Sequence, residues 1–206
     1  MTTKTVHLAL YDTLADWEIG FATARINNPA FQKNPGSHRV RTVGATLDPI
    51  TTMGGLRVLP ELALADVDPA DSAMLVLPGA DTWDGGNAEF ARAARRWLEA
   101  GVPVAAICGA TVGLAAEGLL DDRPHTGNAP EELAGVAGYT GAEHYRADRA
   151  VRAGGLVTAG GASALEFARE VLAELDLYDP AVLEAWYGLF HTADPVWFGK
   201  LRAAVS

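Results

Sequence analysis

Residues 102–116 read VPVAAICGATVGLAA, and this stretch decides the fold. It begins with a short apolar run, 102–108, which is typical of a strand buried on both faces of a sheet. A helical pattern starts at Gly109 without any linker. A buried strand that passes directly into a helix is characteristic of α/β proteins with a parallel sheet.

The rest of the chain repeats this alternation of strand and helix. Apolar runs at 5–11 (TVHLALY) and 73–78 (AMLVLP) predict two more buried strands, and 38–44 predicts a further one. Helical spacing of apolar residues predicts helices over 16–28, 87–100, 109–120 and from Ser163 onward, where Ser163 and Glu166 have the spacing of a capping box. Hairpins are predicted at 50–59, turning at Gly54 and Gly55, and at 150–159, where a late strand is the alternative. We therefore expect an α/β fold with a mainly parallel central sheet.

The last part of the chain has a different character. Residues 180–206 hold five aromatic side chains, and Asp194 with Pro195 divides them into two expected helices. We interpret 180–206 as a helical extension of a single domain that spans 1–206, covering one face of the sheet. A lid or a subunit contact is the alternative.

Composition excludes several classes of partner. The chain of 206 residues has 16 basic and 26 acidic side chains and a net charge of −10, so it repels nucleic acid and anionic membrane surfaces. No secretory signal and no apolar run of about 18 residues is visible, so we expect a cytoplasmic protein without a membrane span. The single cysteine cannot form an internal disulfide. The histidines lack metal-ligand spacing, and we expect no metal or other cofactor.

Cys108 stands where the predicted strand turns into the predicted helix. Small neighbours, Ala106 and Gly109, allow the sharp turn of a nucleophile elbow. A thiol at a helix N-terminus is favoured as the thiolate, and the N–H groups of such a turn can hold an oxyanion. The alternative is that Cys108 is a small buried hydrophobic residue.

Two other segments should end near the same edge of the sheet. After the first strand, Asp16 is placed to cap a helix, and Glu18 lies in its first turn. Glu18 either complements the helix dipole or faces Cys108, where a protonated carboxyl group would donate a hydrogen bond to a thiolate and move a proton. Residues 78–81 read PGAD, and their amides either complete an oxyanion site or form a plain turn.

Four segments together resemble the ThiJ/PfpI superfamily, which shares the fold of class I glutamine amidotransferases and includes the Parkinsonism-associated protein deglycase. They are ALYDTLADWE at 9–18, LVLPGA at 75–80, AAICGATVGLAAEGLL at 105–120 and GGASALEFAREVL at 160–172. The resemblance implies a flavodoxin-like three-layer sandwich and commonly a homodimer. It also implies a reactive cysteine at Cys108 bonded to an acid at Glu18, with oxyanion amides at Gly109, Gly79 and Ala80.

The sequence departs from the family pattern at the expected histidines. The protease-like branch has histidine directly after the nucleophile, where this chain has Gly109, and the deglycase branch has histidine where this chain has Asn128. His125, in HTGN at 125–128, is the remaining histidine candidate for the site, or else a structural residue. No late His-x-Glu pair exists, so the amidotransferase likeness describes the fold and not the activity. Trp83 and Asp84 either line the mouth of the site or cap their loop.

Three functional hypotheses follow. The first is an enzyme in which Cys108 attacks a small electrophilic substrate, with glyoxalase or deglycase, hydratase, lyase or amide-hydrolase chemistry. The second is a non-catalytic redox sensor for the stress response, whose cysteine is oxidised to a sulfenic or sulfinic acid. The third is an interaction module that uses the aromatic C-terminal segment to bind a partner or a second subunit.

Overall fold

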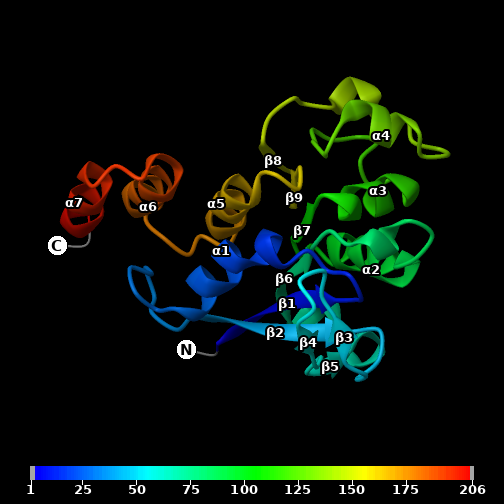
Figure 1. The fold of residues 1–206 in the computed structure, drawn as a ribbon, viewed down its shortest axis with the longest axis horizontal. Helices are drawn as coiled ribbons and strands as arrows, with labels where there is room; N and C mark the ends of the chain where they lie inside the picture. The colour runs from blue at the N-terminus through cyan, green and yellow to red at the C-terminus, as the bar shows by residue number, and fades with distance from the viewer. Residues whose placement is uncertain (1–2, 205–206) are drawn as a thin grey trace.

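The computed structural model describes residues 3–204 and contains a seven-stranded sheet in the order β5-β2-β1-β6-β7-β9-β8 (Figure 1). Its strands are β1 (Lys4–Leu10), β2 (His38–Gly44), β5 (Leu62–Ala63), β6 (Ser72–Leu77), β7 (Val104–Ile107), β8 (Ala150–Ala153) and β9 (Leu156–Ala159). Every neighbouring pair is parallel except β8 and β9. The predicted mainly parallel α/β sheet is confirmed.

Helices cover both faces of the sheet and make three layers. The helices are α1 (Asp16–Asn27), α2 (Ala88–Glu99), α3 (Gly109–Ala116), α4 (Pro130–Ala134), α5 (Ala164–Glu174), α6 (Pro180–Thr192) and α7 (Val196–Ala203). The first and fifth helices pack on each other on one face, and α2 packs on α3 on the other. The central strands are mostly apolar because both of their faces are covered, and all four residues of β7 are fully buried.

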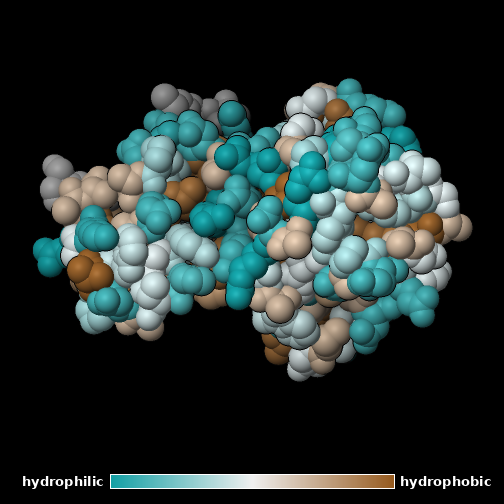
Figure 2. Space-filling view, turned by 90° about the horizontal axis from the view of Figure 1, so that it is seen from above, coloured by the Kyte–Doolittle hydropathy of each residue, from teal (hydrophilic) through white to brown (hydrophobic). Residues whose placement is uncertain are grey.

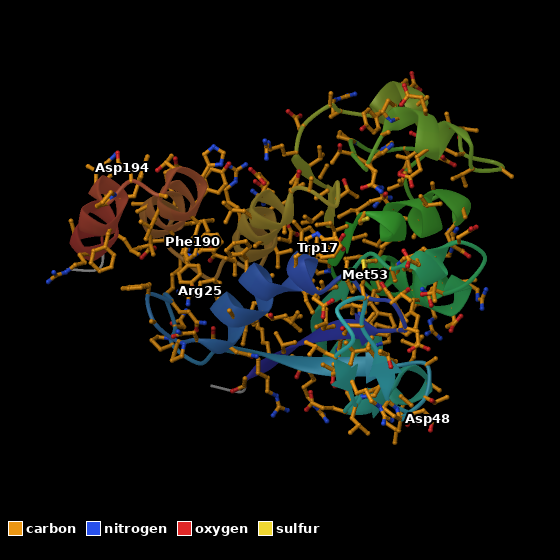
Figure 3. The ribbon with its side chains drawn as sticks, viewed as in Figure 1. Trp17, Arg25, Asp48, Met53, Phe190 and Asp194 are labelled. Atoms are coloured by element: carbon orange, nitrogen blue, oxygen red, sulfur yellow. The ribbon has the colours of Figure 1, made fainter. Side chains whose placement is uncertain are left out.

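The predicted hairpin at 50–59 forms from β3 (Ile50–Thr51) and β4 (Arg57–Val58), outside the main sheet. Asp16 does not cap α1, because Ala15 occupies the N-cap position. Its carboxylate instead accepts a hydrogen bond of 2.7 Å from the Gly54 N–H in the hairpin turn. The Met53 N–H also donates to the Leu14 carbonyl, so the hairpin lies beside the start of α1, as the labelled Trp17 and Met53 show (Figure 3).

The C-terminal helices pack mainly on other helices. The α6 helix contacts α5, and α7 contacts α6 (Figure 1). Trp186 and Phe190 of α6 make edge contacts with Phe21 of α1. The expected pair of helices is present, but it extends the helical layer formed by α1 and α5 and does not lie directly on the sheet.

Other expectations were wrong at element ends. The helix after Cys108 ends at Ala116, since Gly118 adopts a positive φ of 65° that terminates the turn. The short strand β5 was not predicted. The capping box at Ser163 does not form: Ser163 has φ −114° and ψ 35°, and its side chain makes no capping hydrogen bond. Within residues 3–204, none of the helices has the length and hydrophobicity needed to cross a membrane.

Candidate active site

Cys108 occupies a strained turn between β7 and α3. Its backbone has φ 61° and ψ −130°, a conformation that side-chain-bearing residues adopt at a cost of about 1–3 kcal/mol. The Cys108 N–H donates to the Ala159 carbonyl at 2.9 Å, and the Cys108 carbonyl accepts from the Thr111 N–H at 3.0 Å. These bonds hold the elbow from both sides, as the strand-to-helix junction predicted.

The Cys108 sulfur lies between two glycines from the neighbouring strands. A β carbon on Gly79, after β6, would lie 2.9 Å from Sγ, and one on Gly161, after β9, would lie 2.8 Å from it. Because β7 lies between β6 and β9, the loops that follow all three strands meet at one edge of the sheet. The sulfur therefore occupies a narrow slot and is only partly accessible.

Glu18 closes the slot from α1. It is fully buried, and its Oε2 accepts a hydrogen bond of 2.6 Å from the Gly79 N–H. Its Oε1 is buried and has no hydrogen-bond partner among residues 3–204. A β carbon on Gly161 would lie 3.0 Å from this oxygen and 2.8 Å from the Cys108 Sγ, so the two atoms are neighbours. The structure thus brings Glu18 and Cys108 together, in agreement with the functional interpretation of both residues.

The two groups influence each other's protonation. Burial raises the pKa of Glu18, while the Gly79 N–H and the Cys108 thiol act in the opposite direction. Burial, followed by the charge of Glu18, raises the pKa of the Cys108 thiol to about 11. The expected lowering of the thiol pKa is therefore wrong for a cysteine beside ionised Glu18. Both groups therefore hold a proton more tightly than they would in water.

Two hydrogen-bond donors face the sulfur and favour its thiolate form. The Asn128 side chain donates to Sγ at 3.5 Å, and its Oδ1 accepts from the Gly161 N–H at 2.9 Å. The Gly109 N–H, in the first turn of α3, also lowers the pKa of Cys108. Asn128 and Gly109 therefore lie beside the sulfur, where both would stabilise negative charge on it during a reaction.

His125 does not reach Cys108. It is fully buried, its Nε2 pairs with the Tyr139 hydroxyl at 2.7 Å, and its Nδ1 pairs with the Arg123 carbonyl at 2.9 Å. Burial lowers its pKa, so the ring is neutral. Both ring nitrogens are used for structure, which leaves no imidazole acting on the sulfur from this position.

The expected oxyanion amides are only partly available. The Gly79 N–H is bonded to Glu18, so Gly79 positions the acid, and the Gly109 and Ala80 amides remain as candidates. Trp83 is buried, with its Nε1 bonded to the Pro78 carbonyl at 2.9 Å. Its ring packs against Gly113, where a β carbon would lie 2.2 Å from it. Trp83 therefore supports α3 from beside the loop.

Sequence reasoning missed two residues of the site, Gly161 and Trp17. The Trp17 side chain is 54% exposed, and its Nε1 donates to the Gly161 carbonyl at 3.0 Å. Together with Asn128, it fixes the Gly161 peptide against the sulfur. One sequence signal could have identified Gly161: it follows an apolar strand directly, and that strand ends at the same edge of the sheet as Cys108 and Gly79.

Few potential metal ligands surround Cys108 in the described part of the chain. In the described range 3–204, no group of three or more histidine, cysteine, aspartate or glutamate side chains is arranged to hold a metal ion. Cys108 and Glu18 are two side chains of these types, and their neighbours in the slot are glycines and an asparagine.

Known proteins that are similar to this chain match it over nearly its whole length. It is 37% identical over 209 residues to the "Uncharacterized protease YoaZ" of Bacillus subtilis (strain 168), with full coverage of both chains. It resembles the crystal structure of a thiJ/pfpI family protein from Bacillus anthracis with 38% identity and a TM-score of 0.91, over 99% of this chain and 98% of that one. The DJ-1 superfamily protein Atu0886 from Agrobacterium tumefaciens follows with 33% identity and a TM-score of 0.83, over 93% of this chain and 99% of that one.

The family profile adds the boundaries of the shared domain. The profile of the DJ-1/PfpI family matches residues 4–174, which run from β1 to the last residue of α5 and leave α6 and α7 outside. The matched range contains Glu18, Cys108, Asn128 and Gly161. On these matches and on its three-layer fold, the chain belongs to the DJ-1/PfpI family.

Proposed function

We propose that the protein is a cysteine-dependent enzyme that acts on small electrophilic substrates. The observation that carries this proposal is the buried carboxyl group of Glu18 beside the sulfur of a strained cysteine. Burying an acid without full hydrogen bonding is costly, and such groups are concentrated at functional sites. A cysteine with a purely structural role requires neither the strained turn nor the acid.

The chemistry follows from the shared proton. As Sγ attacks an electrophilic carbonyl carbon, the new S–C bond forms and the thiol proton passes to the Glu18 carboxylate. The carbonyl π electrons move to its oxygen, which the Gly109 and Ala80 amides stabilise. Glu18 then returns the proton to the oxygen or to a leaving group. An α-oxoaldehyde fits this sequence, and hydratase or amide-hydrolase chemistry would use the same first step.

The printed name of the relative from Bacillus subtilis suggests proteolysis, which we consider less suited to this site. Cysteine proteases pair the nucleophile with an imidazole that protonates the leaving amine. Among residues 3–204, no histidine is hydrogen-bonded to Cys108, and the equivalent contact is made by the Asn128 amide, which cannot exchange a proton in this role. In this site the proton for a leaving amine would have to come from Glu18, whereas a carbonyl substrate without an amine leaving group does not need it.

Redox sensing is the second candidate function, because the thiol is partly accessible. Peroxide oxidises the thiolate, and burial together with the charge of Glu18 raises the pKa of this thiol, which disfavours the thiolate at rest. A thiol that Glu18 deprotonates during attack does not need to be ionised at rest. The protonation state therefore favours the enzyme over the sensor.

A turnover assay tests the proposal. Wild-type protein and the Cys108→Ala variant are compared on a panel of α-oxoaldehydes, nitriles, isonitriles and small amides, with product detected by chromatography. Turnover by the wild type alone supports the enzyme. If no compound is consumed and mild peroxide adds two oxygen atoms selectively to Cys108, the sensor is supported instead. The expected homodimer stays a prediction, which sedimentation of the purified protein would test.

A further inference from the structure

Three arginines of α2 line one cavity, which has a volume of about 580 Å³. They are Arg92, Arg95 and Arg96, and residues three and four apart lie on the same face of a helix. Figure 2 shows that hydrophilic side chains cover much of the surface seen from above, so one exposed charge is ordinary. Three arginines around one cavity stand out, however, in a chain with 16 basic and 26 acidic residues.

The charge of Arg95 is balanced by a partner from the neighbouring helix. Its Nε lies 3.5 Å from Oε2 of Glu117, the C-cap residue of α3, and its Nη2 donates to the Glu117 carbonyl. These contacts join α2 to the end of α3. Arg95 and Glu117 therefore form a fixed, electrically neutral part of the cavity wall.

Arg92 and Arg96 have no such partner. Within residues 3–204, neither guanidinium group forms an ion pair, and both side chains are exposed. The Arg96 guanidinium lies over the ring of the buried Trp97, 5.8 Å from the ring centroid, which restrains it without neutralising it. Like charges four residues apart on a helix repel each other. An anion between Arg92 and Arg96 would remove this repulsion.

The remaining acid of the cavity, Glu89, does not neutralise these two arginines. It is exposed, and although it lies three residues before Arg92, no ion pair joins the two side chains. Glu89, Arg92 and Arg96 follow one another at about one turn of helix each. An anion between the arginines therefore lies beyond Arg92 as seen from Glu89, whose exposed charge is screened by solvent.

Another part of the cavity wall is apolar. Ala45 directly follows β2, and Leu64 and Ala65 directly follow β5. Leu64 is buried, and neither it nor the two alanines has a polar side chain. Such a wall gains from contact with the apolar part of a ligand, whereas a bare inorganic ion gains only from the arginines. The cavity therefore suits a ligand with an anionic group and an apolar body.

We propose that this cavity binds a small phosphate ester, with its phosphate between Arg92 and Arg96 and its apolar part against Leu64. The planar guanidinium group binds phosphate through two parallel N–H donors, and two arginines match the two charges of a phosphate dianion better than the single charge of a carboxylate. Glu117 marks the end of α3 opposite Cys108, and the eight residues of that helix span about 12 Å. The site is therefore separate from Cys108, and this inference does not depend on the proposed function.

A titration with phenyl phosphate tests the proposal. At pH 8 this ester is a dianion, because its second pKa is about 6. It is added to the ¹⁵N-labelled protein at constant ionic strength, with sodium chloride as the blank. We expect saturable shifts of the amide signals of residues 92–97 and of Ala65, with a Kd on the order of 1 mM or below. Inorganic phosphate should bind about tenfold more weakly, and benzyl alcohol, which has no charge, should cause no shift at 10 mM.

Matched variants locate the site. Arg92→Gln and Arg96→Gln should each weaken the binding of phenyl phosphate about tenfold. Arg39→Gln removes the same charge from an exposed position of β2 outside the cavity and should leave the Kd unchanged. Cys108→Ala should also bind as the wild type does, since the two sites are separate.

Three results would overturn the proposal. The first is the absence of saturable shifts up to 10 mM phenyl phosphate. The second is equal weakening by Arg39→Gln and Arg92→Gln, which would indicate attraction to surface charge in general. The third is equal affinity for inorganic phosphate and phenyl phosphate, which would show that an adventitious ion binds and that the apolar wall contributes nothing. Loss of binding in Cys108→Ala would instead place the ligand at the Cys108 slot and would also overturn the assignment.

Discussion

Gly161 lies so close to Cys108 that a β carbon on it would be 2.8 Å from the sulfur. The two residues are far apart in sequence and meet because β9 pairs with β7, which brings the loop after β9 to the strained turn of Cys108. Glycine at 161 therefore sets the size of the slot and the distance between Sγ and Glu18, whose Oε1 would lie 3.0 Å from the same β carbon.

Gly161→Ala should therefore impair the chemistry more than the fold. The added methyl group displaces the sulfur or the loop, and displacements of about 1 Å at a reacting group cost roughly a hundredfold in rate. We expect a fall of that order in the rate of Cys108 alkylation or of turnover, with retained far-UV circular dichroism. Gly20→Ala, in α1, is the control because nothing lies within 4 Å of its β-carbon position. Equal rates in both variants would contradict the role of Gly161.

Glu18→Gln should lower the pKa of the thiol. The charge of Glu18 is, after burial, the largest cause that raises the pKa of Cys108 to about 11, and glutamine removes this charge. The thiolate absorbance at 240 nm, titrated in wild-type and variant proteins with Cys108→Ala as the blank, measures the change. A wild-type thiol that ionises below pH 7 would contradict the expectation that Glu18 loses its proton before Cys108 does. It would instead support the arrangement expected from the sequence, in which a Cys108 thiolate lies beside protonated Glu18.

Glu18 also predicts the pH dependence of stability. Its pKa is raised by folding, so the folded state binds the proton more tightly than the unfolded state. Stability is therefore lost as pH rises from the ordinary glutamate pKa through the raised value, and the loss persists at neutral pH. We expect Glu18→Gln to stabilise the protein at pH 7 in urea unfolding, with a smaller gain below pH 4. A variant less stable than the wild type at pH 7 would contradict this sign.

The sequence predicted the elements whose burial leaves a local pattern. The strands β1, β6 and β7 are largely apolar because helices cover both of their faces, and the junction of strand, Cys108 and Gly109 identified the elbow. Glu18 was found because a short segment after β1 must end at the same edge of the sheet. The family resemblance led independently to the same two residues.

The remaining parts of the site depend on contacts between distant segments. Gly161 and Trp17 contact each other through a hydrogen bond that no local pattern encodes. His125 was misjudged because its segment pairs with Tyr145 and buries the ring beside Tyr139. The capping box failed because Glu166 interacts with Arg149 and Tyr187, partners that come from other elements.

Two buried tryptophans provide a matched test of packing against hydrogen bonding. Trp97 of α2 is fully buried, and its Nε1 donates to the Ser72 hydroxyl at 2.9 Å. Trp186 of α6 is 3% exposed, and its buried Nε1 has no hydrogen-bond partner in the described range 3–204. Substitution by phenylalanine removes the same atoms at both positions but breaks a hydrogen bond only at Trp97.

Trp97→Phe should therefore destabilise the protein more than Trp186→Phe, by about 1 kcal/mol, the usual net value of one hydrogen bond. Both variants lose buried ring volume, and Trp186→Phe also removes an unsatisfied donor, which offsets part of its loss. Urea unfolding followed by circular dichroism gives the two free energies of unfolding. Ser72→Ala in the wild-type and Trp97→Phe backgrounds completes a double-mutant cycle that isolates the hydrogen bond from the lost volume. A coupling energy of zero, or a larger loss at Trp186, would show that packing alone governs both positions.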